Sequence, residues 1–167
     1  MGGLVASDPD EIRKLPYDKR VAMLWDVFKN NPNEAARWDA VWLAGELAEE
    51  TGLKGSIFEQ VQYMCGWVLQ NDQNSIVRHE VCYQIAGRAM HAQIPNLLHA
   101  AMHDESELVR HEATECLSII HANEESKKAI EKNLNDPSLI VRETAAFVQK
   151  RMERIDGKEY DRMLKSF

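Results

Sequence analysis

Residues 71–78 of the chain read NDQNSIVR, and the same pattern returns without gaps at residues 103–110 (HDESELVR) and 135–142 (NDPSLIVR). The final arginines of successive copies lie 32 residues apart. A fainter copy at residues 31–37 (NPNEAAR) ends with an arginine that precedes the next one by 41 residues, and a longer loop around residues 51–55 accounts for the difference. Self-similarity at a fixed period predicts a chain built by stacking small similar units.

Each copy begins with residues that cap helices and continues into an apolar pattern with helical spacing. Asn, Asp, Ser and Pro at its start are typical of turns and helix N-termini. After residues 103–108 the apolar positions are Val109, Ala113, Leu117 and Ile120, separated by four, four and three residues. A less regular helix is expected before each copy, and the four expected ranges are 17–30, 56–70, 93–103 and 124–134.

Two helices per repeat predict an all-α fold, a HEAT-like α-solenoid of about four helix pairs. The period is short for general HEAT repeats and close to that of tetratricopeptide and ankyrin repeats, but the signature residues of those two repeats are absent. We expect an N-terminal segment at 1–16 with a short helix near 8–15, a repeat domain at 17–154 and a C-terminal tail at 155–167.

Composition and charge limit the classes of function. The 167 residues are 44% hydrophobic and 28% charged, which is enough apolar material for a core. The formal net charge of −7 argues against nucleic acid and against an anionic membrane surface as partners. Three cysteines at unrelated spacings make no disulfide framework, and the sequence shows neither a signal peptide nor a run of about 18 apolar residues. We therefore expect a soluble, cytoplasmic protein.

The two central copies alone continue from their arginine into a His-Glu pair, His79-Glu80 and His111-Glu112. Each histidine lies about 200° around its helix from the apolar residue two positions earlier, so both should point away from the core on neighbouring helices. Helices packed about 8–10 Å apart let two imidazoles converge on one ion. A carboxylate from Glu112 or Glu80 would complete a two-His-one-carboxylate set, which suits non-haem iron. The alternative is that these are ordinary surface histidines.

The residues around these pairs resemble one known family. Residues 79–87 (HEVCYQIAG), 94–98 (IPNLL) and 109–117 (VRHEATECL) look like deoxyhypusine hydroxylase. That family is a HEAT-like solenoid of two similar halves, each with two His-Glu motifs, which holds a non-haem di-iron centre and hydroxylates a modified lysine on a translation factor. The resemblance implies that this chain is an enzyme of the same kind, an iron-dependent hydroxylase.

Carried over position by position, the resemblance implies that His79, His111 and Glu112 ligate one iron and that Glu80 orients the substrate. The arginines that precede the two histidines would be structural. The chain departs from the family because it holds two His-Glu motifs and not four. A full centre with two irons would therefore require a homodimer in which the concave faces meet, and otherwise the chain would hold a lone iron or none.

An acidic concave face carrying Glu80, Glu112 and Glu115 would favour a cationic, amine-bearing substrate, possibly a protein side chain. Manganese or zinc would also suit the same ligands. A rival interpretation is a metal-free HEAT-repeat adaptor that binds a protein, and a third is a scaffold of the kind associated with phycobiliprotein lyases.

Residues beside the candidate site have plain structural interpretations as well. Cys82 and Cys116 are expected to be packed thiols, and His103 a turn residue. Trp38 stands where the two central repeats have histidine, and we expect it either to pack on the surface or, in a dimer, to wall the cavity or meet the partner chain. Tyr83 is expected either to line the pocket or to pack.

Overall fold

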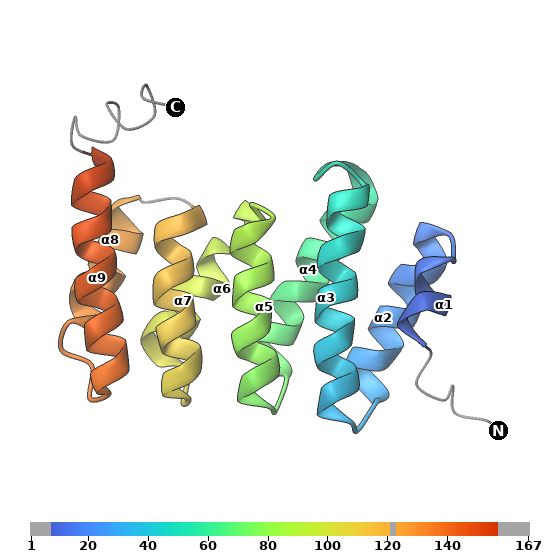
Figure 1. Ribbon diagram of the computed structural model, residues 1–167, viewed down its shortest axis with the longest axis horizontal. Coiled ribbons are helices and arrows are strands. Elements are labelled where there is room, and N and C mark those ends of the chain that lie inside the picture. Colours follow the sequence, from blue (N-terminus) through green and yellow to red (C-terminus); the bar gives the residue numbers. More distant parts are fainter. Residues whose placement is uncertain (1–7, 121–122, 157–167) are drawn as a thin grey trace.

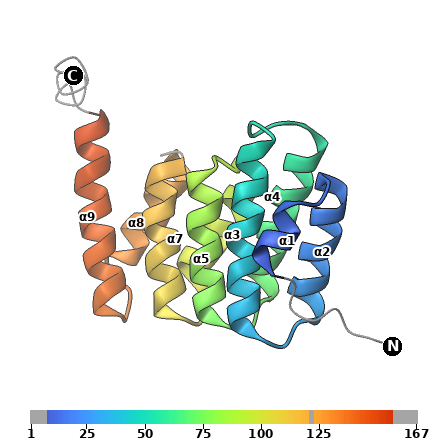
Figure 2. The ribbon, with the colours of Figure 1, turned by 45° about the vertical axis from the view of Figure 1, so that its right-hand side comes forward.

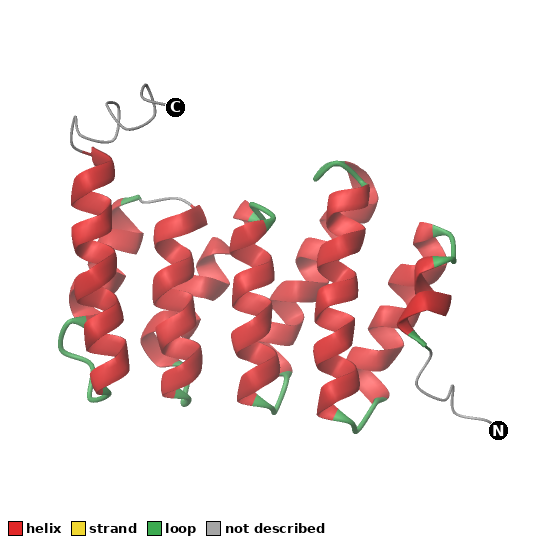
Figure 3. Ribbon diagram, viewed as in Figure 1, coloured by secondary structure: helices red, strands yellow, loops and turns green. Residues whose placement is uncertain are grey.

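The computed structural model describes residues 8–120 and 123–156, and within them it contains helices and no strand (Figure 3). The predicted all-α solenoid is confirmed. The α-helices are α1 (Pro9–Arg13), α2 (Tyr17–Asn30), α3 (Glu34–Glu50), α4 (Gly55–Asn71), α5 (Ser75–Gly87), α6 (Ile94–His103), α7 (Glu107–Ile120), α8 (Glu124–Asn133) and α9 (Leu139–Asp156), with a 3-10 turn η1 (His91–Gln93) before α6.

The helices form two layers. Figure 1 shows α3, α5, α7 and α9 side by side in one row, with α2, α4, α6 and α8 behind them, and Figure 2 shows the same two layers from another side. Each helix of the front row packs against its neighbours in the row and against the helices behind it. The repeats therefore stack in sequence order, and equivalent residues of successive repeats lie in rows across the front layer.

The predicted helix ranges agree with the structure within one residue for α2, α4, α6 and α8. The predicted N-terminal helix ends earlier than expected, at Arg13, because Pro16 already caps the next helix. His103 is the last residue of α6 and not a turn residue, since the backbone N–H of Asp104 still bonds to the helix. Residues 1–7 of the predicted N-terminal segment and residues 157–167 of the predicted tail lie outside the described residues.

The aspartate of the repeat shapes the turn before each front-row helix. Oδ1 of Asp72, Asp104 and Asp136 accepts a hydrogen bond from the backbone N–H two residues later, at 2.9, 2.9 and 2.8 Å. Asn74 then caps α5 by accepting from the N–H groups of Ile76 and Val77. These local bonds explain why the Asx-rich pattern starts a helix at the same point in every copy.

The arginine of the repeat joins each repeat to the next one. Arg37 binds Asp72, Arg78 binds Asp104 and Arg110 binds Asp136, each through two guanidinium nitrogens at 2.7 to 3.2 Å. Nη1 of each arginine also donates to the main-chain oxygen six residues earlier in its own turn. The 32-residue spacing of the arginines is therefore the spacing of a repeated, largely buried ion pair, and a structural role explains Arg78 and Arg110.

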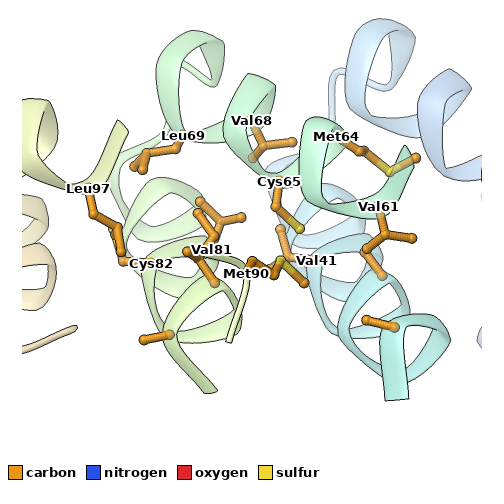
Figure 4. Packing of buried hydrophobic residues seen from close by; sticks show 14 of the residues in the cluster. Val41, Val61, Met64, Cys65, Val68, Leu69, Val81, Cys82, Met90 and Leu97 are labelled. Carbon is orange, nitrogen blue, oxygen red and sulfur yellow. The ribbon is translucent and has the colours of Figure 1, made fainter. Parts of the chain in front are cut away.

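The core lies between the two layers. Figure 4 shows Cys82 of α5 beside Leu97 and Val81 beside Met90, with Cys65, Val41 and Val61 continuing the apolar cluster toward the N-terminal repeats. Cys65, Cys82 and Cys116 are all buried free thiols, and burial raises the pKa of Cys65 to about 12 and that of the other two well above the usual range. The expectation that Cys82 and Cys116 are packed thiols is confirmed.

Candidate metal centre

The two histidines of the His-Glu pairs lie side by side in the first turns of α5 and α7. The rings of His79 and His111 have centroids 6.5 Å apart and planes inclined by 19°, and their side chains are 27% and 22% exposed. Val77 and Val109, two residues earlier on each helix, are fully buried. The histidines therefore leave the core side of their helices, as the helical spacing predicts.

Glu112 lies between the two imidazoles. Its Oε2 is 3.2 Å from Nε2 of His79 and 3.9 Å from Nε2 of His111. The ligand atoms of the three residues all lie within 4.8 Å of one another, and among the described residues this is the group of His, Cys, Asp and Glu side chains arranged to hold an ion. Ligands about 2.1 Å from one ion are separated by about 3 Å, so the three residues fit an ion after small side-chain movements.

Charge in the site is already balanced between His79 and Glu112. The hydrogen bond to Glu112 raises the pKa of His79 above its usual range, and the charges of Glu112 and Glu80 act in the same direction. Burial works to raise the pKa of Glu112, but the hydrogen bond and charge of His79 outweigh it, so that this pKa lies below its ordinary value. Because an imidazole must be deprotonated to bind a metal, an ion bound here would compete with protonation of His79.

Cys116 extends the site toward the core. Its thiol contacts Oε1 of Glu112 at 3.5 Å, one helical turn further along α7. Because the pKa of this buried thiol is raised well above its usual range, it contacts the carboxylate as a neutral S–H group. Cys116 therefore supports the carboxylate and is not itself one of the three clustered ligands.

One register rule describes the contacts between neighbouring repeats. In each of the two contacts, the first partner is the second residue after the arginine of its repeat. The other partner is the histidine that directly follows the arginine of the preceding repeat. Glu112 faces His79 in this way, and Thr144 faces His111, with Oγ1 of Thr144 2.6 Å from Nδ1 of His111. Sequence reasoning missed Thr144, although its place in the repeat is equivalent to that of Glu112.

Glu80 does not join the cluster. Its Oε1 accepts a hydrogen bond from Nε2 of Gln84 at 3.1 Å, and the three clustered ligands do not include it. Of the two carboxylates, Glu112 is the one that lies near both imidazoles, because it reaches back to the histidine of the previous repeat. Glu80 occupies the same register position one repeat earlier, where the ring position is taken by Trp38.

Aromatic side chains follow the same rows on the N-terminal side of the histidines. Trp38 lies 6.0 Å from Trp42, and Trp42 lies 6.2 Å from Tyr83, measured between ring centroids. Trp38 is partly buried and packs against the core, whereas Tyr83 is 47% exposed. The packing expected of Trp38 is therefore present, and Tyr83 remains accessible one helical turn after His79.

A second pair of histidines, His99 and His103, lies on α6 with ring centroids 5.1 Å apart and ring planes tilted by 45°. Both side chains are exposed along a groove that also includes Asp104 and Glu105. In the described part of the chain no third ligand completes this pair. The His99–His103 pair therefore lacks the nearby carboxylate that Glu112 provides for His79 and His111.

Within the described residues, no helix has both the length and the apolar character needed to span a membrane.

Comparison with known proteins finds similarity to the family that the His-Glu motifs resemble. A family model for HEAT repeats matches residues 66–148. Deoxyhypusine hydroxylase of Phaeosphaeria nodorum is 34% identical over 74 residues, which is 44% of this chain and 22% of the relative. The enzyme of Aspergillus fumigatus is 32% identical over 93 residues, 54% of this chain and 26% of the relative.

A solved structure has the same fold. Human deoxyhypusine hydroxylase in complex with glycerol superposes with a TM-score of 0.64 at 23% identity, covering 80% of this chain and 43% of the human one. The matches with the curated relatives span about a quarter of their length. The resemblance predicted from the motifs is confirmed, and the chain is a protein of HEAT-like repeats that is similar to the deoxyhypusine hydroxylases.

Proposed function

We propose that the chain is an iron-dependent hydroxylase whose metal ligands are His79, His111 and Glu112. The observation that carries this proposal is the position of Glu112 Oε2 between the two imidazoles, at 3.2 and 3.9 Å from their Nε2 atoms. Similarity to the deoxyhypusine hydroxylases supports the reaction class. It also supports iron over manganese or zinc, to which the ligand set itself is open.

Two imidazoles and one carboxylate leave coordination positions free for other ligands, which is typical of non-haem iron sites. Bound iron would supply the redox chemistry through which dioxygen oxidises a C–H bond. The chain's own residues have other tasks: the three ligands hold the ion between α5 and α7, and the neighbouring carboxylates and rings bind and orient the substrate. Cys116, buried and neutral, backs Glu112 from the core side.

A second copy of the chain would complete the centre. The human enzyme is more than twice the length that this chain matches, and the chain carries one ligand cluster in its described part. Two copies related by a two-fold axis, with their α3–α5–α7–α9 faces together, would bring two such clusters opposite each other. We therefore propose a homodimer with two irons.

The substrate class follows from the charge around the cluster. Glu80 stands one residue after His79, is held by Gln84 and is free of the ligand group, so it can receive a cationic amine next to the ion. Glu115 follows His111 by one helical turn and adds to the acidic character. The relatives' name, deoxyhypusine hydroxylase, points to deoxyhypusine, a modified lysine, as the amine-bearing side chain.

A protein-binding adaptor is the second candidate, and exposed apolar side chains favour it. Tyr83 and Phe147 follow their repeat arginines by five residues in both cases, so they share a row of the front layer, and they are 47% and 62% exposed. Such side chains on the face that carries the histidines are also what a protein ligand would cover.

Metal loading separates the two candidates. The chain, purified and loaded anaerobically with Fe(II), is analysed for iron content and for molar mass in solution. We expect one iron per chain, two per dimer, and loss of iron in the His79→Ala, His111→Ala double variant with unchanged helical circular dichroism. The matched control is the His99→Ala, His103→Ala variant, which removes the other pair of neighbouring histidines and should keep its iron.

Activity is then assayed on a peptide carrying deoxyhypusine, with a mass gain of one oxygen atom as the readout. A folded, dimeric or monomeric chain that takes up no Fe(II) would refute the enzyme and leave the adaptor. Iron bound by a strictly monomeric chain would refute the shared centre while keeping the ligand assignment.

A further inference from the structure

Thr144 of α9 contacts His111 on the side of the ring away from the candidate ion. Oγ1 of Thr144 is 2.6 Å from Nδ1 of His111 and 2.8 Å from the main-chain oxygen of Ile140. The same imidazole therefore meets α9 with one nitrogen and Glu112 with the other, because its Nε2 lies 3.9 Å from Oε2 of Glu112.

The two contacts of Thr144 determine where the protons lie. A hydroxyl has one proton to donate, and the carbonyl of Ile140 can only accept. The hydroxyl proton of Thr144 must point to Ile140, since otherwise two acceptor oxygens would face each other at 2.8 Å. The Thr144 oxygen is then an acceptor toward His111, so Nδ1 of His111 is the donor.

We propose that Thr144 is a positioning residue that holds His111 as the Nδ1–H tautomer with the lone pair of Nε2 directed into the metal centre. A neutral imidazole that carries its proton on Nδ1 has its lone pair on Nε2, which is the atom beside Glu112. This inference rests on the proposed function, because the lone pair of Nε2 is proposed to bind the metal ion.

The register of the repeats explains why a hydroxyl stands at this position. Thr144 is equivalent to Glu112, so each clustered histidine is met by the residue two positions after the next repeat's arginine. The two partners act differently: Glu112 faces Nε2 and joins the ion, whereas Thr144 faces Nδ1 and stays outside. The Thr144 hydroxyl oxygen orients the ring by accepting a hydrogen bond from Nδ1, and it adds no further carboxylate to the cluster.

Histidine nitrogen chemical shifts test the tautomer without any metal. In long-range proton–nitrogen spectra of the metal-free, nitrogen-15-labelled chain at a pH where His111 is neutral, we expect a protonated Nδ1 and an unprotonated Nε2. Thr144→Ser should keep this signature and Thr144→Val should lose it. A wild-type His111 protonated on Nε2, or an unchanged signature in Thr144→Val, would overturn the proposal.

Fe(II) affinity tests the consequence for the ion. Loss of an outer hydrogen-bond partner of a metal-bound histidine commonly weakens metal binding by about 10- to 100-fold, and we expect that loss in Thr144→Val, with Thr144→Ser close to wild type. Thr51→Val is the matched control, because Thr51 also donates to a main-chain oxygen, that of Ala48, at the far end of α3.

The outcomes distinguish a failure of the Thr144 positioning role from a failure of the proposed function. A wild-type chain that binds no Fe(II) would refute the proposed function, and the positioning role with it. Normal wild-type binding together with an unchanged affinity in folded Thr144→Val would refute the positioning role alone.

Discussion

Gln84 of α5 places its side-chain oxygen against α3 at Gly45, at a point that a Cβ on residue 45 would overlap. Gln84 is completely buried, and its Nε2 donates to Glu80 at 3.1 Å. The guanidinium of Arg88 lies 3.1 Å from the same Cβ position. The absence of a side chain at Gly45 leaves room for the buried Gln84, and Gln84 in turn binds Glu80 beside the candidate metal centre.

Gly45→Ala should destabilise the protein and release Glu80. The new methyl group has to displace the buried Gln84 or separate α3 from α5, and overpacking of this kind costs about 1–3 kcal/mol, against which alanine gains up to about 1 kcal/mol in helix propensity. The measurement is the free energy of unfolding in urea. Fe(II) affinity should stay unchanged, because Glu80 is outside the ligand group.

Gly87→Ala is the matched control, since a Cβ there meets nothing within 4 Å and alanine suits a helix better than glycine by up to about 1 kcal/mol. Equal effects of the two substitutions would contradict the steric role of Gly45.

Asp104→Ala should cost about 3 kcal/mol of unfolding free energy, because removing one partner of a buried ion pair leaves the other charge without compensation. The side chains of Arg78 and Asp104 are only 7% and 10% exposed, and two bonds of 2.9 Å join them. Chemical unfolding measures the loss. The neighbouring Glu105 also contacts Arg78, at 3.5 Å, but is 86% exposed, so Glu105→Ala should cost less than about 1 kcal/mol. A larger loss of stability in Glu105→Ala than in Asp104→Ala would refute the structural role of the Arg78–Asp104 ion pair.

Acid should weaken the link between the last two repeats. The hydrogen bonds from Arg110 hold the pKa of Asp136 below its ordinary value. A carboxyl group with a lowered folded pKa stabilises the protein above its unfolded pKa, about 3.9, and this stability is lost as the pH falls through the folded value. Wild type should therefore lose stability below about pH 4. Asp136→Asn should be less stable at neutral pH and lose less on acidification, as urea unfolding at several pH values will show. Parallel pH profiles of the two proteins would contradict the prediction.

Glu80→Gln should separate substrate binding from metal binding. If Glu80 receives a cationic amine, loss of its charge removes a hydrogen bond worth about 1.5–3 kcal/mol, or roughly a 10-fold or greater fall in kcat/KM. The Fe(II) content should not change, because the ligands are untouched. Glu115→Gln lies one helical turn beyond His111 and serves as the control with a smaller expected effect. Equal activity of Glu80→Gln and wild type would exclude Glu80 from substrate binding.

Local signals were enough to predict much of the architecture. The helices expected before each Asx-rich copy of the repeat are α2, α4, α6 and α8, and their predicted ends agree with the observed ends within one residue. The repeated arginine identified the repeating unit of two helices. The angle of about 100° per residue predicted that His79 and His111 point away from the buried Val77 and Val109. Each of these features is visible in the sequence, because it depends on residues a few positions apart on one helix or on the repeat itself.

The sequence by itself therefore determined the stacked helix pairs and the two histidines that share a face. Only the tertiary structure decided that Glu112 joins them, that Glu80 stays with Gln84, and that Thr144 holds the far side of His111. The contacts of His79 with Glu112 and of His111 with Thr144 each join residues 33 positions apart on neighbouring helices. Which flank of one helix meets the next is set by how the two layers pack and not by the spacing along either helix. Glu80 and Gln84 are four residues apart on α5, and the structure adds that the buried Gln84 is the hydrogen-bond partner of Glu80.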